Sequence, residues 1–236
     1  MSDTAHTDIK SQLLEAAEMH VPFDGWSDAS FQAAIADSGV DPAVAKALCP
    51  RGAVDLAVAY HKRGDSQMVA ALTDATLAEM KIREKITFAV RTRLELCPDR
   101  EIVRRGSTLF ALPQYAATGA QLIWGTADAI WTAIGDTSQD FNWYSKRATL
   151  SAVYSATVLY WLGDDSDGHT ATWAFLDRRI ENVMQFEKTK APFNNSPVGK
   201  MMSGPLAAPS KPRAATIPGS TPGTWGKTRT AEPRAP

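Results

Sequence analysis

One stretch constrains the fold of this chain more than any other: residues 140–162, DFNWYSKRATLSAVYSATVLYWL. Its second part, Ala148 to Leu162, runs for 15 residues without a charge, a glycine or a proline. Large apolar residues surround the axis of the predicted helix there, and a helix that is apolar all round lies at the centre of its bundle. Fifteen residues are fewer than the ~20 that span a bilayer. The stretch therefore predicts a buried central helix in a soluble all-α protein.

The rest of the chain up to Lys190 has the same helical character. Apolar residues recur with helical spacing, capping residues precede each run, and no stretch sustains the alternation of a β-strand. We predict about nine helices, at residues 5–20, 28–38, 42–48, 51–63, 66–96, 99–111, 114–133, 140–162 and 169–188. Short helices come first and long ones later, which predicts a headpiece over residues 1–64 and a helical bundle domain over residues 65–190.

The composition changes near Lys190. Residues 191–236 hold nine of the fourteen prolines and carry a net charge of +5, whereas the preceding residues carry −6. Such a segment cannot bury enough apolar surface to fold, so we predict a disordered, Pro-rich basic tail. A solvated end is the simpler interpretation, and attraction to anionic surfaces is the alternative.

Residues 31–48, FQAAIADSGVDPAVAKAL, have the pattern of a helix-turn-helix. An apolar helix is followed by a turn at Ser38 and Gly39, and Asp41-Pro42 then opens a second short helix. Residues 24–50 nevertheless carry four aspartates and a single cation, Lys46, for a net charge of −3. Because such a surface repels a polyanion, we expect a structural headpiece and no nucleic-acid partner.

No catalytic or metal-binding pattern is present in the sequence. There is no nucleophile elbow, Walker loop or dinucleotide fingerprint, and Cys49 and Cys97 do not have zinc spacing. The four histidines lie far apart and form no Glu-x-x-His pair. The acidic turn GDDSDG, residues 163–168, fails as a calcium loop because Ala174 stands where a bidentate glutamate is needed. We therefore predict a binding protein without catalytic residues, metal or cofactor; the alternative, a helical enzyme, requires a buried acid or histidine with a strongly shifted pKa.

The amino terminus, MSDTAHTDIK, has neither the apolar run of a secretory signal nor the composition of a transit peptide. We expect a cytoplasmic protein, with peripheral attachment to the inner face of a bacterial membrane as an additional option. Removal of a leader would instead place it on the matrix side of a mitochondrial membrane.

The first two turns of the 140–162 helix place Asp140, Trp143, Tyr144 and Arg147 on one stripe. These residue types dominate protein interfaces, so the stripe is a candidate partner-binding site. The alternative is that both aromatic residues pack into the bundle while Asp140 and Arg147 form a surface pair.

Bulky and small residues alternate in residues 109–131 and again along the 140–162 helix. This mixture fits either plain core packing or a cavity that holds a small molecule. The candidate lining residues are Leu109, Phe110, Leu122, Ile123, Trp124, Trp131, Tyr154 and Leu159.

Residues 140–183, DFNWYSKRATLSAVYSATVLYWLGDDSDGHTATWAFLDRRIENV, resemble the carboxy-terminal signature of the Coq-nine family of coenzyme Q (ubiquinone) biosynthesis accessory proteins. Residues 13–40, LLEAAEMHVPFDGWSDASFQAAIADSGV, extend the resemblance to most of the body. The resemblance implies a TetR-like fold, a homodimer, and a cavity for isoprenylated quinone lipids that are presented to a di-iron demethoxyubiquinone hydroxylase. It implies a lipid-binding protein rather than an enzyme.

The same resemblance implies that Asp140, Trp143 and Tyr144 dock the hydroxylase, with Arg147 added on the helical-face argument alone. The chain departs from the family where members carry an amphipathic membrane-binding helix, because five prolines interrupt residues 191–215. Peripheral membrane contact would then rely on the basic tail. A TetR-type, ligand-responsive transcription regulator is the alternative function.

Overall fold

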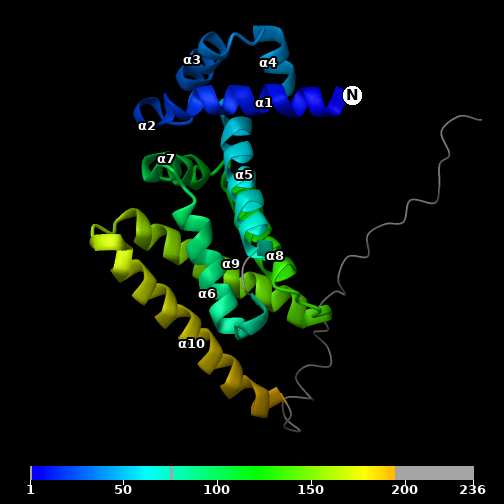
Figure 1. Ribbon diagram of the computed structural model, residues 1–236, viewed down its shortest axis with the longest axis vertical. Helices are drawn as coiled ribbons and strands as arrows, with labels where there is room; N and C mark the ends of the chain where they lie inside the picture. The colour runs from blue at the N-terminus through cyan, green and yellow to red at the C-terminus, as the bar shows by residue number, and fades with distance from the viewer. Residues whose placement is uncertain (1, 75–76, 195–236) are drawn as a thin grey trace, which may run out of the picture.

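The computed structural model of the protein describes residues 2–74 and 77–194, and for residues 2–5, 73–74, 140 and 186–194 it describes the backbone alone. Within these ranges the chain forms ten α-helices, two 3₁₀-helices and no β-strand, which confirms the all-α class (Figure 1). The helices are α1 (Ser2–Glu18), α2 (Val21–Asp24), α3 (Asp28–Ser38), α4 (Pro42–Leu48), α5 (Ala53–Asp74), η1 (Leu77–Glu79), α6 (Ile82–Glu95), α7 (Arg100–Ala111), α8 (Ala116–Ala133), α9 (Asp140–Leu162), η2 (Asp167–His169) and α10 (Thr170–Asn194). The disordered tail was predicted to begin at residue 191, but α10 continues to Asn194, so that start is wrong; the rest of the predicted tail, from residue 195 onward, lies outside the described residues.

The predicted helix-turn-helix is present as α3 and α4. Ser27 and Ser30 cap the start of α3 reciprocally, since each side-chain oxygen accepts a hydrogen bond from the backbone N–H of the other, at 3.3 and 3.1 Å. Gly39 follows α3 with a φ of +67°, a left-handed conformation that favours glycine. The Asp41 carboxylate then caps α4 by accepting from the backbone N–H of Ala43 at 2.8 Å. Local chemistry therefore fixes both ends of this turn.

Helix α5 continues through Gly64, so the prediction of separate helices at residues 51–63 and 66–96 is wrong. Gly64 does not break the helix; it makes room for α6. A Cβ atom at this position would lie 2.6 Å from the guanidinium carbon of Arg93, far inside van der Waals contact. The actual break between α5 and α6 comes after Asp74, and the short α2 was not predicted.

Two hydrophobic cores lie above and below the middle of α5 (Figure 1). The headpiece core unites α1, α3, α4 and the first half of α5, and it includes Leu13, Phe31 and Leu56. The bundle core unites the end of α5 with α6, α8, α9 and α10, and it includes Met68 and Leu176. A boundary at residue 64 therefore falls inside a helix that both cores share.

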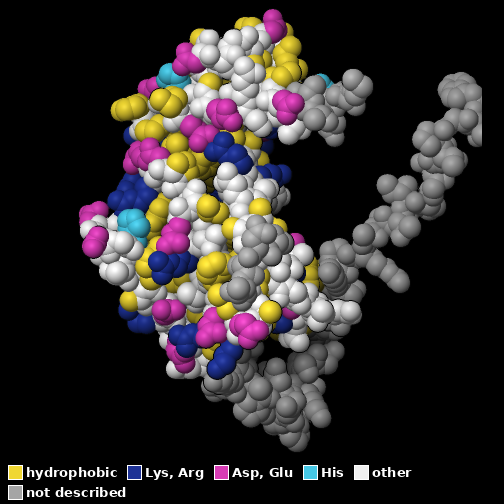
Figure 2. All heavy atoms as spheres, in the orientation of Figure 1, with side chains coloured by type: hydrophobic (Ala, Val, Ile, Leu, Met, Phe, Trp, Pro, Cys, Tyr) yellow, Lys and Arg dark blue, Asp and Glu magenta, His cyan; other side chains and the backbone are white. Residues whose placement is uncertain are grey.

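Three arginines of α7 hold this helix between the headpiece and the bundle. Arg100 and Arg104 donate hydrogen bonds to the last backbone carbonyls of α9, at 3.2 and 2.6 Å. Arg105 donates to the carbonyl of Pro22 at 2.9 Å. The final carbonyls of a helix lack partners within it, so arginines are suited to this place. On the face shown in Figure 2, basic side chains gather at the level of α7.

Helix α9 has the predicted bounds, but it is not buried all round. Leu150, Val153 and Tyr154 face the core, whereas Leu159 and Tyr160 are exposed on the outer side. No helix in the described ranges has the length and apolar content needed to cross a bilayer.

Candidate functional site

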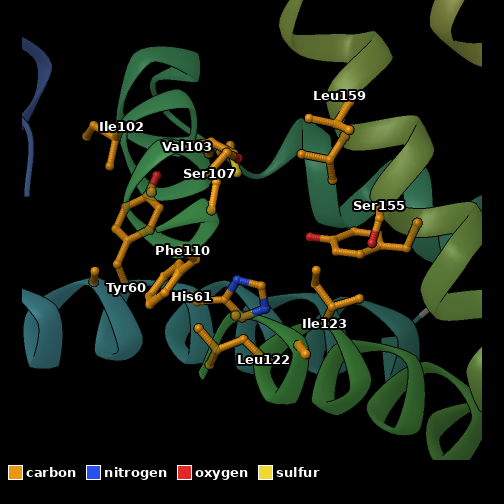
Figure 3. Close-up of a pocket in the computed structure, with 18 of the residues that line it drawn as sticks. Tyr60, His61, Ile102, Val103, Ser107, Phe110, Leu122, Ile123, Ser155 and Leu159 are labelled. Carbon is orange, nitrogen blue, oxygen red and sulfur yellow. The ribbon is translucent and has the colours of Figure 1, made fainter. Parts of the chain in front are cut away.

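A cavity of about 400 Å³ lies between α5, α6, α7, α8 and α9 (Figure 3). Its volume falls within the range of small-molecule sites, and its wall is mainly apolar. Five of the eight predicted lining residues contribute to the wall: Phe110, Leu122, Ile123, Tyr154 and Leu159. The structure thus brings together residues that are about 50 positions apart in the sequence.

The cavity has an open side and a closed side. Leu159 on α9 is 67% exposed, and with the exposed Ala111 and Ala120 it marks the mouth between α7, α8 and α9. At the closed side Trp26 and Tyr60 pack against each other, with ring centroids 5.8 Å apart. Figure 3 shows Tyr60 and Leu159 on opposite sides of the space. The headpiece residue Trp26 therefore seals the inner end.

Small residues let α7 and α8 meet closely at the wall. A Cβ atom on Gly119 would lie 2.8 Å from the Cβ atom of Phe110. Because the two helices approach at a glycine, the Phe110 ring is directed along the wall of the cavity (Figure 3). The alternation of bulky and small residues in the sequence thus reflects both close packing and a cavity.

A polar cluster interrupts the apolar wall. Arg93, whose side chain is buried, donates from Nε to the Asp65 carboxylate at 2.8 Å and from a terminal nitrogen to the carbonyl of His61 at 3.1 Å. The Thr126 hydroxyl donates to the same carboxylate at 3.0 Å and lies 2.8 Å from His61 Nε2. Burial lowers the pKa of His61 to about 4, so this ring is neutral at physiological pH. The cluster is therefore an internally paired, electrically balanced group.

The head of α9 carries the aromatic half of the predicted partner-binding site. Trp143 and Tyr144 contact each other edge to face at a centroid distance of 4.8 Å, and Trp124 of α8 lies about as close to both, at 6.0 and 6.4 Å. Trp124 was predicted to line the cavity and instead belongs to this aromatic cluster. Phe141, one turn earlier, is 58% exposed and was not predicted. The side chain of Asp140 lies outside the described residues.

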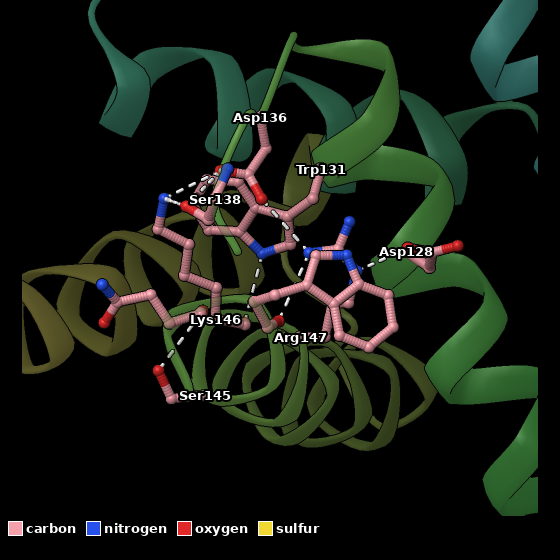
Figure 4. A network of polar contacts seen from close by, with 9 residues as sticks. Asp128, Trp131, Asp136, Ser138, Ser145, Lys146 and Arg147 are labelled. Carbon is pink, nitrogen blue, oxygen red and sulfur yellow. Dashed lines mark hydrogen bonds and ion pairs between the residues drawn. The ribbon is translucent and has the colours of Figure 1, made fainter. Parts of the chain in front are cut away.

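Arg147 does not lie on the surface as the stripe predicted. Only 2% of the residue is exposed, and its guanidinium bonds Asp128 at 2.5 Å and Asp136 at 3.1 Å (Figure 4). The same group lies 4.2 Å from the ring centroid of Trp143. Arg147 thus offers no contact surface to a partner; it fixes α9 against α8 and sets the position of Trp143 from behind.

The loop between α8 and α9 is held by the same network. Lys146 Nζ lies 2.8 Å from the Asp136 carboxylate, and Ser138 also donates to it at 2.7 Å. Burial of the Asp136 carboxylate by itself raises its pKa. The hydrogen bonds from Lys146, Ser138 and Arg147 outweigh this effect and hold the pKa of Asp136 well below its usual range. Trp131 donates to the carbonyl of Lys146 at 3.1 Å (Figure 4). The loop is therefore a rigid support for the head of α9.

A second cavity, of about 560 Å³, lies at the other end of the bundle. It is bounded by α6, α9, α10 and the loop between α8 and α9, and Trp131 forms part of its wall. Trp131 was predicted for the same site as Phe110, but the two line different cavities. Leu109, the remaining predicted residue, packs against the headpiece core.

Comparison with known proteins relates the chain to COQ9 proteins. Residues 116–187 match the COQ9 family. The chain is a COQ9 homologue. It is 32% identical over 184 residues to the mitochondrial ubiquinone biosynthesis protein COQ9 of Drosophila melanogaster. The aligned region covers 76% of this chain and 56% of the Drosophila protein. It is 29% identical over 189 residues to the human COQ9 protein, covering 77% and 59%. The resemblance predicted from residues 140–183 is confirmed.

This COQ9 homologue has a TetR-like fold, as predicted. A TetR transcriptional regulator from Nitrosomonas europaea superimposes with a TM-score of 0.61 at 18% identity, covering 74% of this chain and 97% of that one. At this identity the match concerns the fold alone. The chain spans less than two thirds of the length of the two curated relatives above.

The cavity residues of the COQ9 homologue that were not predicted include four with polar side chains: Tyr60, His61, Arg93 and Cys97. Tyr60 and His61 lie on α5, Arg93 lies on α6, and Cys97 follows the end of α6. Their burial results from α7 and α8 crossing over them, which no local pattern encodes. Within the described side chains no cluster of histidine, cysteine and acidic residues is arranged to hold a metal ion.

Proposed function

We propose that this chain is a lipid-binding accessory protein of ubiquinone biosynthesis. In this role it holds an isoprenylated quinone intermediate in the cavity between α5 and α9 and presents it to a demethoxyubiquinone hydroxylase. The names of the related COQ9 proteins support the pathway. The observation that carries the proposal is the 400 Å³ cavity, whose largely apolar wall opens at exposed apolar residues.

The apolar wall favours a hydrocarbon because transfer of its surface out of water releases about 25 cal/mol per Å². The paired polar cluster presents no net charge, so a neutral lipid fits better than a charged one. An isoprenoid chain with a neutral ring meets both conditions.

Lipid extraction followed by mass spectrometry on protein purified from a quinone-producing host tests the proposal. A co-purifying isoprenoid quinone or precursor is the expected result. Protein that stays empty and still binds the hydroxylase would act as a docking scaffold, which would refute the carrier role.

The head of α9 is the proposed docking surface for the hydroxylase. Exposed Phe141 and half-buried Tyr144 supply apolar area there, and the buried Arg147 keeps the surface rigid. Tyr144→Ala and Phe141→Ala are expected to weaken capture of the hydroxylase while the fold persists. Trp173→Ala, on α10, is the matched control. Equal capture by all variants would contradict this assignment.

The proposal includes a homodimer at the membrane surface, as the family resemblance implies. Light scattering of the purified protein and flotation with anionic vesicles measure these two properties. A monomeric protein would refute the proposed homodimer. A protein that never floats with vesicles would refute the proposed membrane contact.

A ligand-responsive transcription regulator is the second candidate, because the chain shares the fold of a TetR protein. The exposed aspartates of the headpiece, Asp24, Asp28, Asp37 and Asp41, oppose contact with phosphates. Salt-sensitive binding to duplex DNA at low ionic strength would favour this candidate.

A further inference from the structure

The second cavity, between α6, α9, α10 and the loop that joins α8 to α9, has walls of two kinds. Its volume of about 560 Å³ exceeds that of the first cavity, and no described residue lines both. The apolar walls include Ile86 of α6, Trp131 of α8 and Ile180 of α10, which are all buried. The polar side chains come from the loop and from the first turns of α9. The cavity is therefore amphipathic.

The change of polarity runs along one face of α9. Asn142, Lys146, Thr149 and Val153 all line the cavity, and their spacings of four, three and four residues place them on the same face. At the helical rise per residue, Asn142 and Val153 lie about 16 Å apart along the axis. Asn142 is exposed, whereas Val153 belongs to the bundle core. A molecule that lies along this face meets polar groups near the mouth and hydrocarbon further inside.

The charged groups beside the cavity are already paired. Lys146 Nζ lies 2.8 Å from the Asp136 carboxylate, which also contacts Arg147 at 3.1 Å. Arg147 in turn pairs with Asp128 (Figure 4). Two cations thus face two acids, and burying a further charge without a partner is costly. The cavity therefore favours a ligand without a net charge.

Two polar side chains of the cavity are free to bond a ligand. Ser138 donates to the Asp136 carboxylate and Ser145 to the carbonyl of Asn142, so both serines are occupied. The side chains of Asn142 and Thr149, in contrast, form no hydrogen bond within the part of the chain that the structure describes. An amide and a hydroxyl can each donate and accept. They lie about one helical turn on either side of Lys146 and can bond a single head group.

We propose that the second cavity is a separate binding site for a small neutral amphiphile of the medium-chain alcohol type. The hydroxyl group of the ligand exchanges hydrogen bonds with Thr149 and Asn142 near the mouth. Its hydrocarbon chain passes Val153 and packs against Trp131 and Ile180, where the apolar walls leave water. This site depends neither on the first cavity nor on the proposed carrier function.

Calorimetric titration of the full chain with octan-1-ol and with octanoate tests the chemistry of the site. Octan-1-ol should bind more tightly, because the carboxylate of octanoate finds no unpaired cation. Thr149→Val keeps the branched shape but removes the hydroxyl, and it should weaken octan-1-ol binding about fivefold, the usual size of one neutral hydrogen bond. Thr132→Val is the matched control, since Thr132 is exposed on α8 and lines neither cavity; its affinity should not change.

Crystals of the unaltered chain soaked with 8-bromooctan-1-ol locate the ligand through the anomalous signal of the bromine atom. We expect this signal between α9 and α10, near Val153 and Ile180. Bromine in the first cavity alone would overturn the proposal, as would the absence of octan-1-ol binding. Equal affinity of Thr149→Val and Thr132→Val for octan-1-ol, or tighter binding of octanoate by the unaltered chain, would overturn the assigned head-group contacts.

Discussion

Gly64→Ala tests whether the contact between α5 and α6 is as close as the structure indicates. In an exposed helix this change stabilises by about 1 kcal/mol, because alanine has the higher helix propensity. Here the new methyl group would lie 2.6–2.7 Å from the guanidinium atoms of Arg93. Carbon contacts need about 3.5 Å, so the guanidinium must move by about 1 Å.

That movement breaks a buried ion pair. Arg93 lies 2.8 Å from Asp65 and 3.1 Å from the carbonyl of His61, and a further 1 Å takes both bonds beyond the usual limit of about 3.2 Å. Breaking a buried pair costs about 3–5 kcal/mol. After the propensity gain, the free energy of unfolding should fall by about 2–4 kcal/mol and Tm by roughly 4–16 °C.

Urea and thermal unfolding followed by circular dichroism measure these changes. Gly125→Ala in α8 is the matched control, since it is an exposed helical glycine with nothing within 4 Å of the new Cβ atom. This control should gain up to about 1 kcal/mol. If Gly64→Ala were as stable as Gly125→Ala, the close contact and the role of Gly64 inferred from it would both be wrong.

Three further predictions follow from buried polar groups. The pKa of His61 falls from 6.5 to about 4 on folding, so the unfolded chain binds more protons between these values, and about 2 kcal/mol of stability should be lost between pH 7 and pH 5. Urea unfolding should show a smaller loss for His61→Gln, and an equal loss would contradict the assignment. Arg147→Ala should cost about 3 kcal/mol in the same assay, against less than about 1 kcal/mol for Arg91→Ala at an exposed pair. Burial raises the pKa of the Cys49 and Cys97 thiols, so both should react slowly with a disulfide reagent at neutral pH until urea is added; rapid labelling of the folded chain would refute this.

Local sequence signals predicted the elements whose ends are set by local chemistry. The bounds of α3 and α4 follow from Ser27, Gly39 and Asp41, and those of α9 from its uninterrupted apolar run. Gly64 misled the prediction because a glycine that ends a helix and one that accommodates a neighbour look alike in a sequence. The distinction depends on Arg93, 29 positions away.

The candidate sites were predictable to a similar extent. The apolar pattern found five cavity residues, because bulky side chains beside small ones signal either packing or a cavity. It could not assign Trp124 and Trp131 to their separate surroundings, since each lies on α8 but faces a different neighbour. Arg147 was assigned to the surface because its partners, Asp128 and Asp136, lie on another helix and a loop.

The position of Trp26 gives the headpiece a structural role in the cavity. This side chain closes the inner end of the cavity and donates from its indole nitrogen to the carbonyl of Ile102 at 3.4 Å. Removal of the headpiece would convert a blind cavity into a channel open at both ends. The headpiece therefore helps to shape the cavity, whatever charges its own surface carries.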